Sequence, residues 1–163
     1  MQGTLSKEPY TNKLTCPRYH GGMRTDQDVA LLVKRLQHRH HRALNAALAQ
    51  LGVSLVQWDT LRHLHENPGA SLHDLAQLTF QTDQAFGTLA TRMADRGLIE
   101  REPGPGRAIR HRITAKGEQI RIEGGRRAAE VLSRTLGGLT AGQLDQLGGL
   151  LELALTDGPP DAG

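Results

Sequence analysis

Arginine and lysine side chains are concentrated in one segment of the chain, where their chemistry is the attraction of phosphate. Residues 101–134 carry nine basic and four acidic side chains, although the whole chain of 163 residues has a net charge of only +3. Residues 135–163 carry four acids and no base. A basic block beside an acidic remainder is typical of a surface that binds a polyanion. Charge alone leaves a solvated basic face as the alternative.

Four of these arginines accompany a predicted β-hairpin. Two alternating segments, residues 98–101 and 108–113, are separated by Pro-Gly-Pro-Gly, which predicts two strands joined by a turn. A glycine-rich tip that carries an arginine suits the minor groove of DNA. We expect Arg107 to enter the groove, and we expect phosphate contacts or structural roles for Arg101, Arg110 and Arg112.

A predicted helix after Thr82 has a polar face opposite its apolar stripe. Short polar side chains near a helix start are suited to reading bases in the major groove, because the backbone amides there meet phosphate. A glycine inside a helix costs about 1 kcal/mol relative to alanine, so Gly87 indicates either close approach to DNA or tight packing on another helix. The residues predicted to contact DNA from this helix are Thr82, Asp83, Gln84, Gly87, Thr88, Thr91 and Arg92.

The surrounding sequence predicts the elements that position these residues. Ser54 opens a helix that ends at Asn-Pro-Gly, Ser71 opens a short helix, and Gly97 ends the helix that follows Thr82. Two short helices separated by a tight turn and followed by a hairpin form a winged helix-turn-helix. The predicted fold is therefore mainly α with a small β-hairpin wing.

Longer helices flank this unit. Apolar residues recur at three and four positions over 26–51, Thr114 opens a basic helix through about 136, and Thr140 with Gln143 opens a leucine-rich last helix. Five aromatic residues in the whole chain favour a helical core of leucine and alanine. We expect an irregular arm over residues 1–25 and a disordered tail over 157–163.

Composition also excludes several classes of protein. Cys16 is the one cysteine, so there is no intramolecular disulfide, and no apolar run is long enough to span a membrane. We expect a soluble, cytoplasmic protein. No nucleophile, base and orienting group come together and no phosphate-binding loop follows a strand, so the sequence predicts neither an enzyme nor a cofactor.

Several segments together resemble the MarR family of bacterial transcription regulators. They are Arg-Met-Ala-Asp-Arg-Gly-Leu-Ile-Glu-Arg at 92–101 and Arg-Ala-Ile-Arg-His-Arg-Ile-Thr-Ala-Lys-Gly at 107–117, with Leu75, Ala76 and the run to Thr82 before them. The likeness extends from about residue 26 to 155. It implies one domain over 26–156, with a winged helix-turn-helix at 54–114 and dimerisation helices at 26–51 and 115–156.

The resemblance further implies a homodimer that binds double-stranded DNA at a palindromic operator and represses transcription. Release by a small aromatic or phenolic ligand, or by thiol oxidation, is implied as well. Two departures stand out, because Gly106-Arg107 replaces the family's Asp-Arg-Arg wing and Thr88 stands where an arginine is common. A winged-helix interaction module without DNA binding is the alternative function.

The resemblance to the MarR family also implies a ligand site in the cleft between the dimer helices and the DNA-binding lobe. A pocket lined by an aromatic and a few polar groups suits an aromatic anion. For Trp58 and His40 a role in the core or the dimer interface is the alternative. The candidates for ligand binding are His40, Trp58, Arg62 and His65.

Redox and metal sensing are the remaining hypotheses. Cys16 becomes a redox switch if its pKa is lowered, for which Arg18 and His20 are weak support. The cluster at residues 38–41 holds three histidines, but their helical spacing does not let them close on one ion. The sequence therefore predicts no metal site within this cluster alone, and a site shared with His63, His65 or a partner chain is the alternative.

Overall fold

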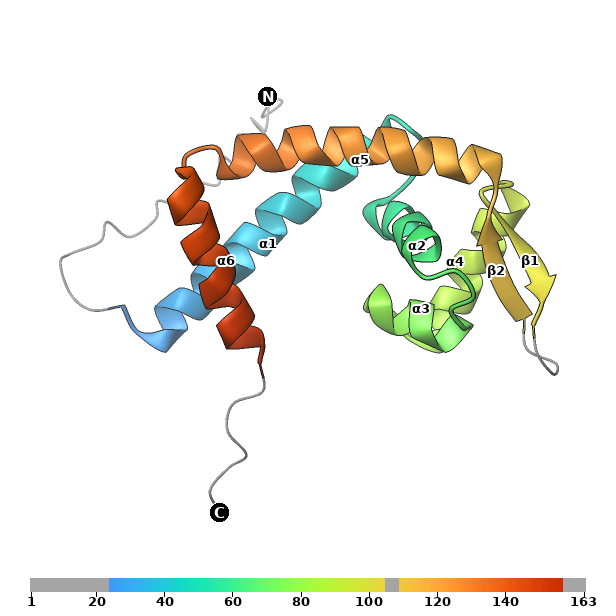
Figure 1. Ribbon diagram of the computed structural model, residues 1–163, viewed down its shortest axis with the longest axis horizontal. Helices are drawn as coiled ribbons and strands as arrows, with labels where there is room; N and C mark the ends of the chain where they lie inside the picture. Colours follow the sequence, from blue (N-terminus) through green and yellow to red (C-terminus); the bar gives the residue numbers. More distant parts are fainter. Residues whose placement is uncertain (1–23, 105–108, 157–163) are drawn as a thin grey trace, which may run out of the picture.

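The computed structural model describes residues 24–104 and 109–156, which form six helices and one antiparallel two-stranded hairpin. The elements are α1 (Asp26–Ala49), α2 (Leu55–Glu66), α3 (Leu72–Leu78), α4 (Asp83–Asp95), β1 (Ile99–Pro103), β2 (Ile109–Ile113), α5 (Ala115–Leu136) and α6 (Ala141–Leu155). They form an arch in which α5 runs from the lobe of α2, α3, α4 and the hairpin to α6 at the other end (Figure 1). The predicted fold class is confirmed.

Short-range capping fixes where the helices begin. Threonine or serine precedes every helix and accepts a hydrogen bond from the backbone amide three residues later, which satisfies one of the free amides of the first turn. In four helices the side chain of that third residue also accepts a hydrogen bond from the backbone amide of the cap, forming a capping box. These four boxes pair Thr25 with Asp28, Ser54 with Gln57, Ser71 with Asp74 and Thr140 with Gln143.

The core lies inside the lobe. Phe86 and Met93 of α4 pack with Leu61 of α2, Leu75 of α3 and Leu98, and all five are fully buried. Because α4 packs one face against this core, its other face remains on the surface of the molecule. Of the two histidines of α2, His63 is buried, whereas His65, a predicted sensor residue, is exposed.

The start of α5 is locked to the lobe by close backbone packing. The Thr114 hydroxyl caps the helix and also donates to the carbonyl oxygen of Gly97 at 2.7 Å. A side chain at Gly117 would place its Cβ 2.1 Å from the carbonyl oxygen of Leu98. Only glycine therefore lets the long helix approach the hairpin this closely.

The hairpin is two pairs longer at its turn end than the predicted strand 98–101, because Glu102 pairs with Arg110 as well. Pro103 pairs with Ile109 as the last residue of β1, although the sequence placed it in the turn. Proline is tolerated at that position because the strand has a partner on one side only. Arg107 lies outside the described residues.

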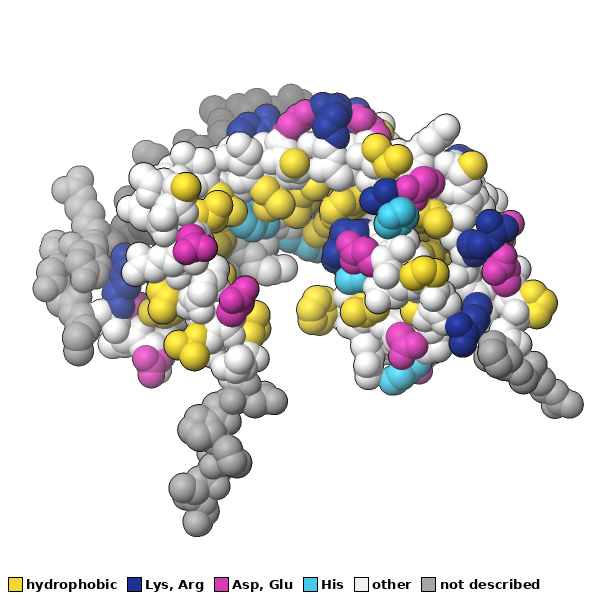
Figure 2. Space-filling model, in the orientation of Figure 1, with side chains coloured by type: hydrophobic (Ala, Val, Ile, Leu, Met, Phe, Trp, Pro, Cys, Tyr) yellow, Lys and Arg dark blue, Asp and Glu magenta, His cyan; other side chains and the backbone are white. Residues whose placement is uncertain are grey.

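The helices at the other end of the arch bury little of their surface within the described chain. In α1 only Leu48 is buried, and in α6 no residue is. Figure 2 shows hydrophobic side chains gathered over α6 and along the inner side of the arch. No helix among the described residues is long and apolar enough to cross a membrane. Cys16, most of the predicted arm and the predicted tail lie outside the described residues.

Candidate nucleic-acid interface

Helix α4 presents an exposed polar face at its first turns. Thr82 caps it, accepting from the amide of Ala85 at 3.2 Å, while Phe86, Ala90 and Met93 hold the opposite face in the core. The side chains left on the surface match the sequence prediction: Thr82, Asp83, Gln84, Thr88, Thr91 and Arg92 are exposed and Gly87 is half-buried. Such a helix offers base-reading side chains and free amides at the same end.

Two threonine hydroxyls of this face already donate within the helix. Thr88 donates to the carbonyl oxygen of Gln84 at 3.2 Å and Thr91 to that of Gly87 at 3.0 Å. A threonine on an exposed helix face can still offer its methyl group to a thymine methyl and an oxygen lone pair to a donor. A Cβ at Gly87 would make only ordinary contact with Leu72, 3.9 Å away, so packing inside the chain does not require glycine there.

Arg101 of β1 joins the hairpin to α4. Its guanidinium donates to the Thr91 hydroxyl oxygen at 2.6 Å, across ten positions of sequence. The arginine is exposed, so its charge stands beside the polar face of α4 without a carboxylate partner among the described residues. This contact adds a fixed cation to a face whose only other arginine is Arg92.

His73 is a residue of this surface that the sequence reasoning missed. Its Nδ1 lies 3.0 and 3.1 Å from the two carboxylate oxygens of Asp83, and Gln77 donates to its Nε2 at 3.1 Å. The neutral ring with a proton on Nδ1 satisfies both contacts. The imidazole therefore holds the carboxylate at the start of α4. The position of His73 in the first turn of α3, the helix before α4, is the sequence feature that could have indicated this contact.

Arg112 has a structural role in the hairpin. Its guanidinium lies against the carboxylates of Glu100 and Glu102 on β1, of which Glu100 is its register partner. The hydrogen bond that Arg112 donates to Glu102, followed by the charges of both glutamates, raises the pKa of Arg112 above its ordinary value. Because two carboxylates match this charge, Arg112 adds little to the attraction of phosphate.

Arg110 ties the hairpin to the turn after α2. Its guanidinium donates to the carbonyl oxygen of Gly69, and the side chain is half-buried. Arg96 makes a comparable link at the end of α4, donating to the carbonyl oxygen of Gly52 at 2.7 Å. Sequence reasoning missed Arg96 because its partner lies 44 positions away. Both arginines fix the lobe around α4.

His111 is buried beneath the hairpin, opposite Arg101 in the register. Its Nδ1 is buried without a hydrogen-bond partner among the described residues. Burial, and to a smaller degree the charge of Arg101, lowers the pKa of His111 below its ordinary value. The ring is therefore held in its neutral form inside the lobe.

The structure does not bring the four predicted sensor residues into one pocket. Trp58 serves the core, because its Nε1 donates to the Arg121 carbonyl oxygen at 3.0 Å and its ring lies against α5. His65 is exposed, with Nδ1 3.4 Å from Glu118. His40 is half-buried on α1, with Nε2 unpartnered among the described residues.

Arg62 lines a hollow of about 660 Å³ between α2 and α3. Its guanidinium is held by Asp59 at 2.8 Å and Glu66 at 3.0 Å. At the rim lies Phe80, which is 94% exposed and has a φ of 55°, a left-handed conformation uncommon for an aromatic residue. No group of side chains among the described residues is arranged to hold a metal ion.

The helix-turn-helix of α3 and α4 followed by the β1–β2 wing defines the class: this is a winged-helix protein. The chain belongs to the MarR family. The family's sequence profile matches residues 51–108. The HTH-type transcriptional repressor Rv2887 of Mycobacterium tuberculosis is 32% identical over 135 residues, which cover 80% of this chain and 96% of the relative.

Solved structures of that mycobacterial protein are similar in fold as well. Its complex with salicylic acid matches with a TM-score of 0.65 and 28% identity, over 77% of this chain and 95% of the other. Its complex with DNA matches with a TM-score of 0.66 and 26% identity, over 78% and 98%. The resemblance read from the sequence is therefore confirmed.

Proposed function

We propose that the protein is a homodimeric transcriptional repressor that binds a palindromic DNA site through α4 and the wing and is released by a small aromatic acid. The observation that carries the proposal is the exposed polar face of α4, with Gln84 at its first turn and Arg101 fixed beside Thr91. The similar mycobacterial protein, whose structures hold DNA and salicylic acid, supports both halves of the proposal.

Dimerisation is supported by the exposure of α6. Its leucines lie on the surface, with Leu150, Leu153 and Leu155 exposed by 58%, 70% and 83%. Covering apolar surface is worth about 25 cal/mol per Å², so a leucine-rich helix with no buried residue in the described chain favours association. Sedimentation equilibrium is expected to give twice the monomer mass.

Selection of bound duplexes from a random pool tests DNA recognition without a known operator. We expect two half-sites related by a palindrome, with centres about one helical turn apart. Replacing Gln84 by alanine should cost about 1–3 kcal/mol of binding on the selected site and relax the preference at one position. Absence of selection, or binding that does not weaken with salt, contradicts the proposal.

A matched pair of arginine variants separates phosphate contacts from general charge. Arg92→Ala, on the exposed face of α4, should lower the slope of log affinity against log salt by about 1. Arg126→Ala makes the same charge change on α5, where Glu123 and Glu130 hold the guanidinium, and should leave the slope unchanged.

Release is tested by titrating the protein–DNA complex with salicylate. We expect dissociation of the complex and a rise in the melting temperature of the free protein, because a ligand that binds the folded state stabilises it. His40→Ala and Arg62→Met test the remaining sensor candidates, and each should weaken the response if the side chain binds the acid. Salicylamide, the uncharged isostere of salicylate, serves as the control ligand.

A further inference from the structure

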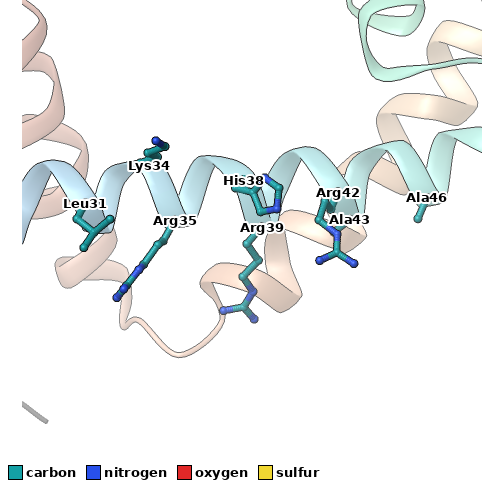
Figure 3. Close-up of a pocket in the computed structure, with 8 residues that line it drawn as sticks. All are labelled: Leu31, Lys34, Arg35, His38, Arg39, Arg42, Ala43 and Ala46. Atoms are coloured by element: carbon teal, nitrogen blue, oxygen red, sulfur yellow. The ribbon is translucent and has the colours of Figure 1, made fainter. Parts of the chain in front are cut away.

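One side of α1 carries a stripe of cationic side chains without counter-charges. Lys34, Arg35, Arg39 and Arg42 form no hydrogen bond or ion pair with the residues of ranges 24–104 and 109–156. Together with His38 they border a hollow of about 740 Å³ whose apolar part is Leu31, Ala43 and Ala46 (Figure 3). The proposed DNA-binding function does not use this stripe.

The spacing of the stripe follows the helix axis. Arg35 and Arg42 are seven positions apart, so they lie about 10.5 Å apart along the axis and within about 20° of one direction. Arg39 lies between them. Beside these arginines runs the apolar side of α1, where Leu32 is exposed by 37%. The helix therefore presents an apolar strip with a cationic edge.

Helix α6 presents the complementary pattern. Asp145 and Glu152 are also seven positions apart, with the same separation of about 10.5 Å along their helix. Both are exposed and neither forms an ion pair within the described chain. Leu144 and Leu151 precede them by one position each, so the acids edge an apolar strip that is left uncovered.

We infer that in a dimer the arginine edge of α1 in one protomer pairs with Asp145 and Glu152 on α6 of a second copy. The inference rests on the homodimer proposed above and identifies the ion pairs that align α1 of one protomer with α6 of the other. The matched spacing lets two ion pairs form at each of two symmetric contacts while the leucine strips cover one another. A bound polyanion would satisfy the arginines but would leave the leucines and the acids of α6 exposed, so a second copy is the occupant that the surface favours.

Charge reversal with cross-rescue tests the contact. In Arg35→Glu/Arg42→Glu, and separately in Asp145→Lys/Glu152→Lys, the like charges that face each other across both contacts should weaken the dimer by about tenfold or more. An equimolar mixture of the two variants should form a heterodimer with near wild-type affinity, because both of its contacts again join opposite charges. The measurement is sedimentation equilibrium of the full chain over a range of NaCl concentrations.

The control variants make the same charge changes on α4. Arg92→Glu and Asp95→Lys should leave the dimer affinity unchanged, since both side chains lie in the lobe. A wild-type dimer that neither reversal weakens, or a mixture that shows no rescue, overturns the inference. So does loss of binding to non-specific duplex DNA in the α1 variant with an intact dimer, which would identify the stripe as a polyanion site. A monomeric wild-type chain would instead refute the proposed homodimer.

Discussion

The guanidinium of Arg110 donates to the backbone carbonyl oxygen of Gly69, joining the second strand of the wing to the turn between α2 and α3. Gly69 has a φ of +89°, and a Cβ there would lie 2.5 Å from Nη1 of the arginine. The contact therefore requires glycine for two reasons: the positive φ disfavours other residues, and a Cβ would occupy the position of the guanidinium. It fixes the wing relative to the helix-turn-helix.

Gly69→Ala is expected to destabilise the protein, since the left-handed conformation costs an L-residue about 1–2 kcal/mol and the arginine must move. Arg110→Ala should cost about 1–3 kcal/mol if it leaves the half-buried carbonyl oxygen without its partner. Urea denaturation measures both. Gly125→Ala is the control, because a Cβ there meets nothing within 4 Å; equal losses at Gly125 and Gly69 would refute the prediction.

Trp58 and Gly124 form a second pair that a double-mutant cycle can test. A Cβ at Gly124 would lie 2.4 Å from Cδ1 of the indole, so Gly124→Ala should cost about 1–3 kcal/mol through overpacking. In a Trp58→Leu background the ring edge is absent and the same change should cost at least about 0.5 kcal/mol less. Strictly additive unfolding free energies would show that the two side chains do not meet.

His111 should make the stability of the protein depend on pH. Its pKa in the folded protein lies below the ordinary value of 6.5. As the pH falls through 6.5 the unfolded chain takes up a proton that the folded chain does not, so the stability decreases until the folded pKa is reached. The melting temperature should therefore drop from pH 7.5 to pH 5.5.

His111→Gln should reduce this drop, whereas His41→Gln, at an exposed position of α1, should preserve it. Differential scanning calorimetry of the three proteins at both pH values makes the comparison. An identical drop in wild type and His111→Gln would mean that another group is responsible.

The contact of His73 with Asp83 should tune DNA binding. The carboxylate lies at the first residue of α4, where a negative charge repels phosphate, and the hydrogen bond from the imidazole N–H partly screens it. His73→Ala should weaken binding to a selected duplex by about threefold, in keeping with the loss of one exposed hydrogen bond. Asp83→Asn should strengthen binding and should make the His73 substitution nearly neutral. Fluorescence anisotropy at two salt concentrations measures these effects, and a weaker complex with Asp83→Asn would indicate that the carboxylate accepts from a base instead.

Local rules of sequence predicted the elements and the exposed face of α4. Ser71 with Asp74 and Thr82 with Ala85 show why, since a cap and its partner are three residues apart and need no other part of the chain. The apolar period then determined that Phe86 and Met93 face inward, leaving Gln84 and Thr88 outside. The wing was predicted in the same way, from alternation and a proline-glycine turn.

Tertiary structure decided which partner each polar side chain takes. Arg110 reaches Gly69 across 41 positions and Trp58 reaches Arg121 across 63, distances over which no sequence period carries information. The same packing turned His63 inward and left His65 on the surface. Residue types and local spacing thus determined the helices, the hairpin and the face offered to DNA. Only the tertiary fold decided that Arg101 lies beside that face, whereas Arg110 and Arg112 bind acceptors within the chain. The reason is that the partner of a long charged side chain depends on which acceptors folding brings within its reach.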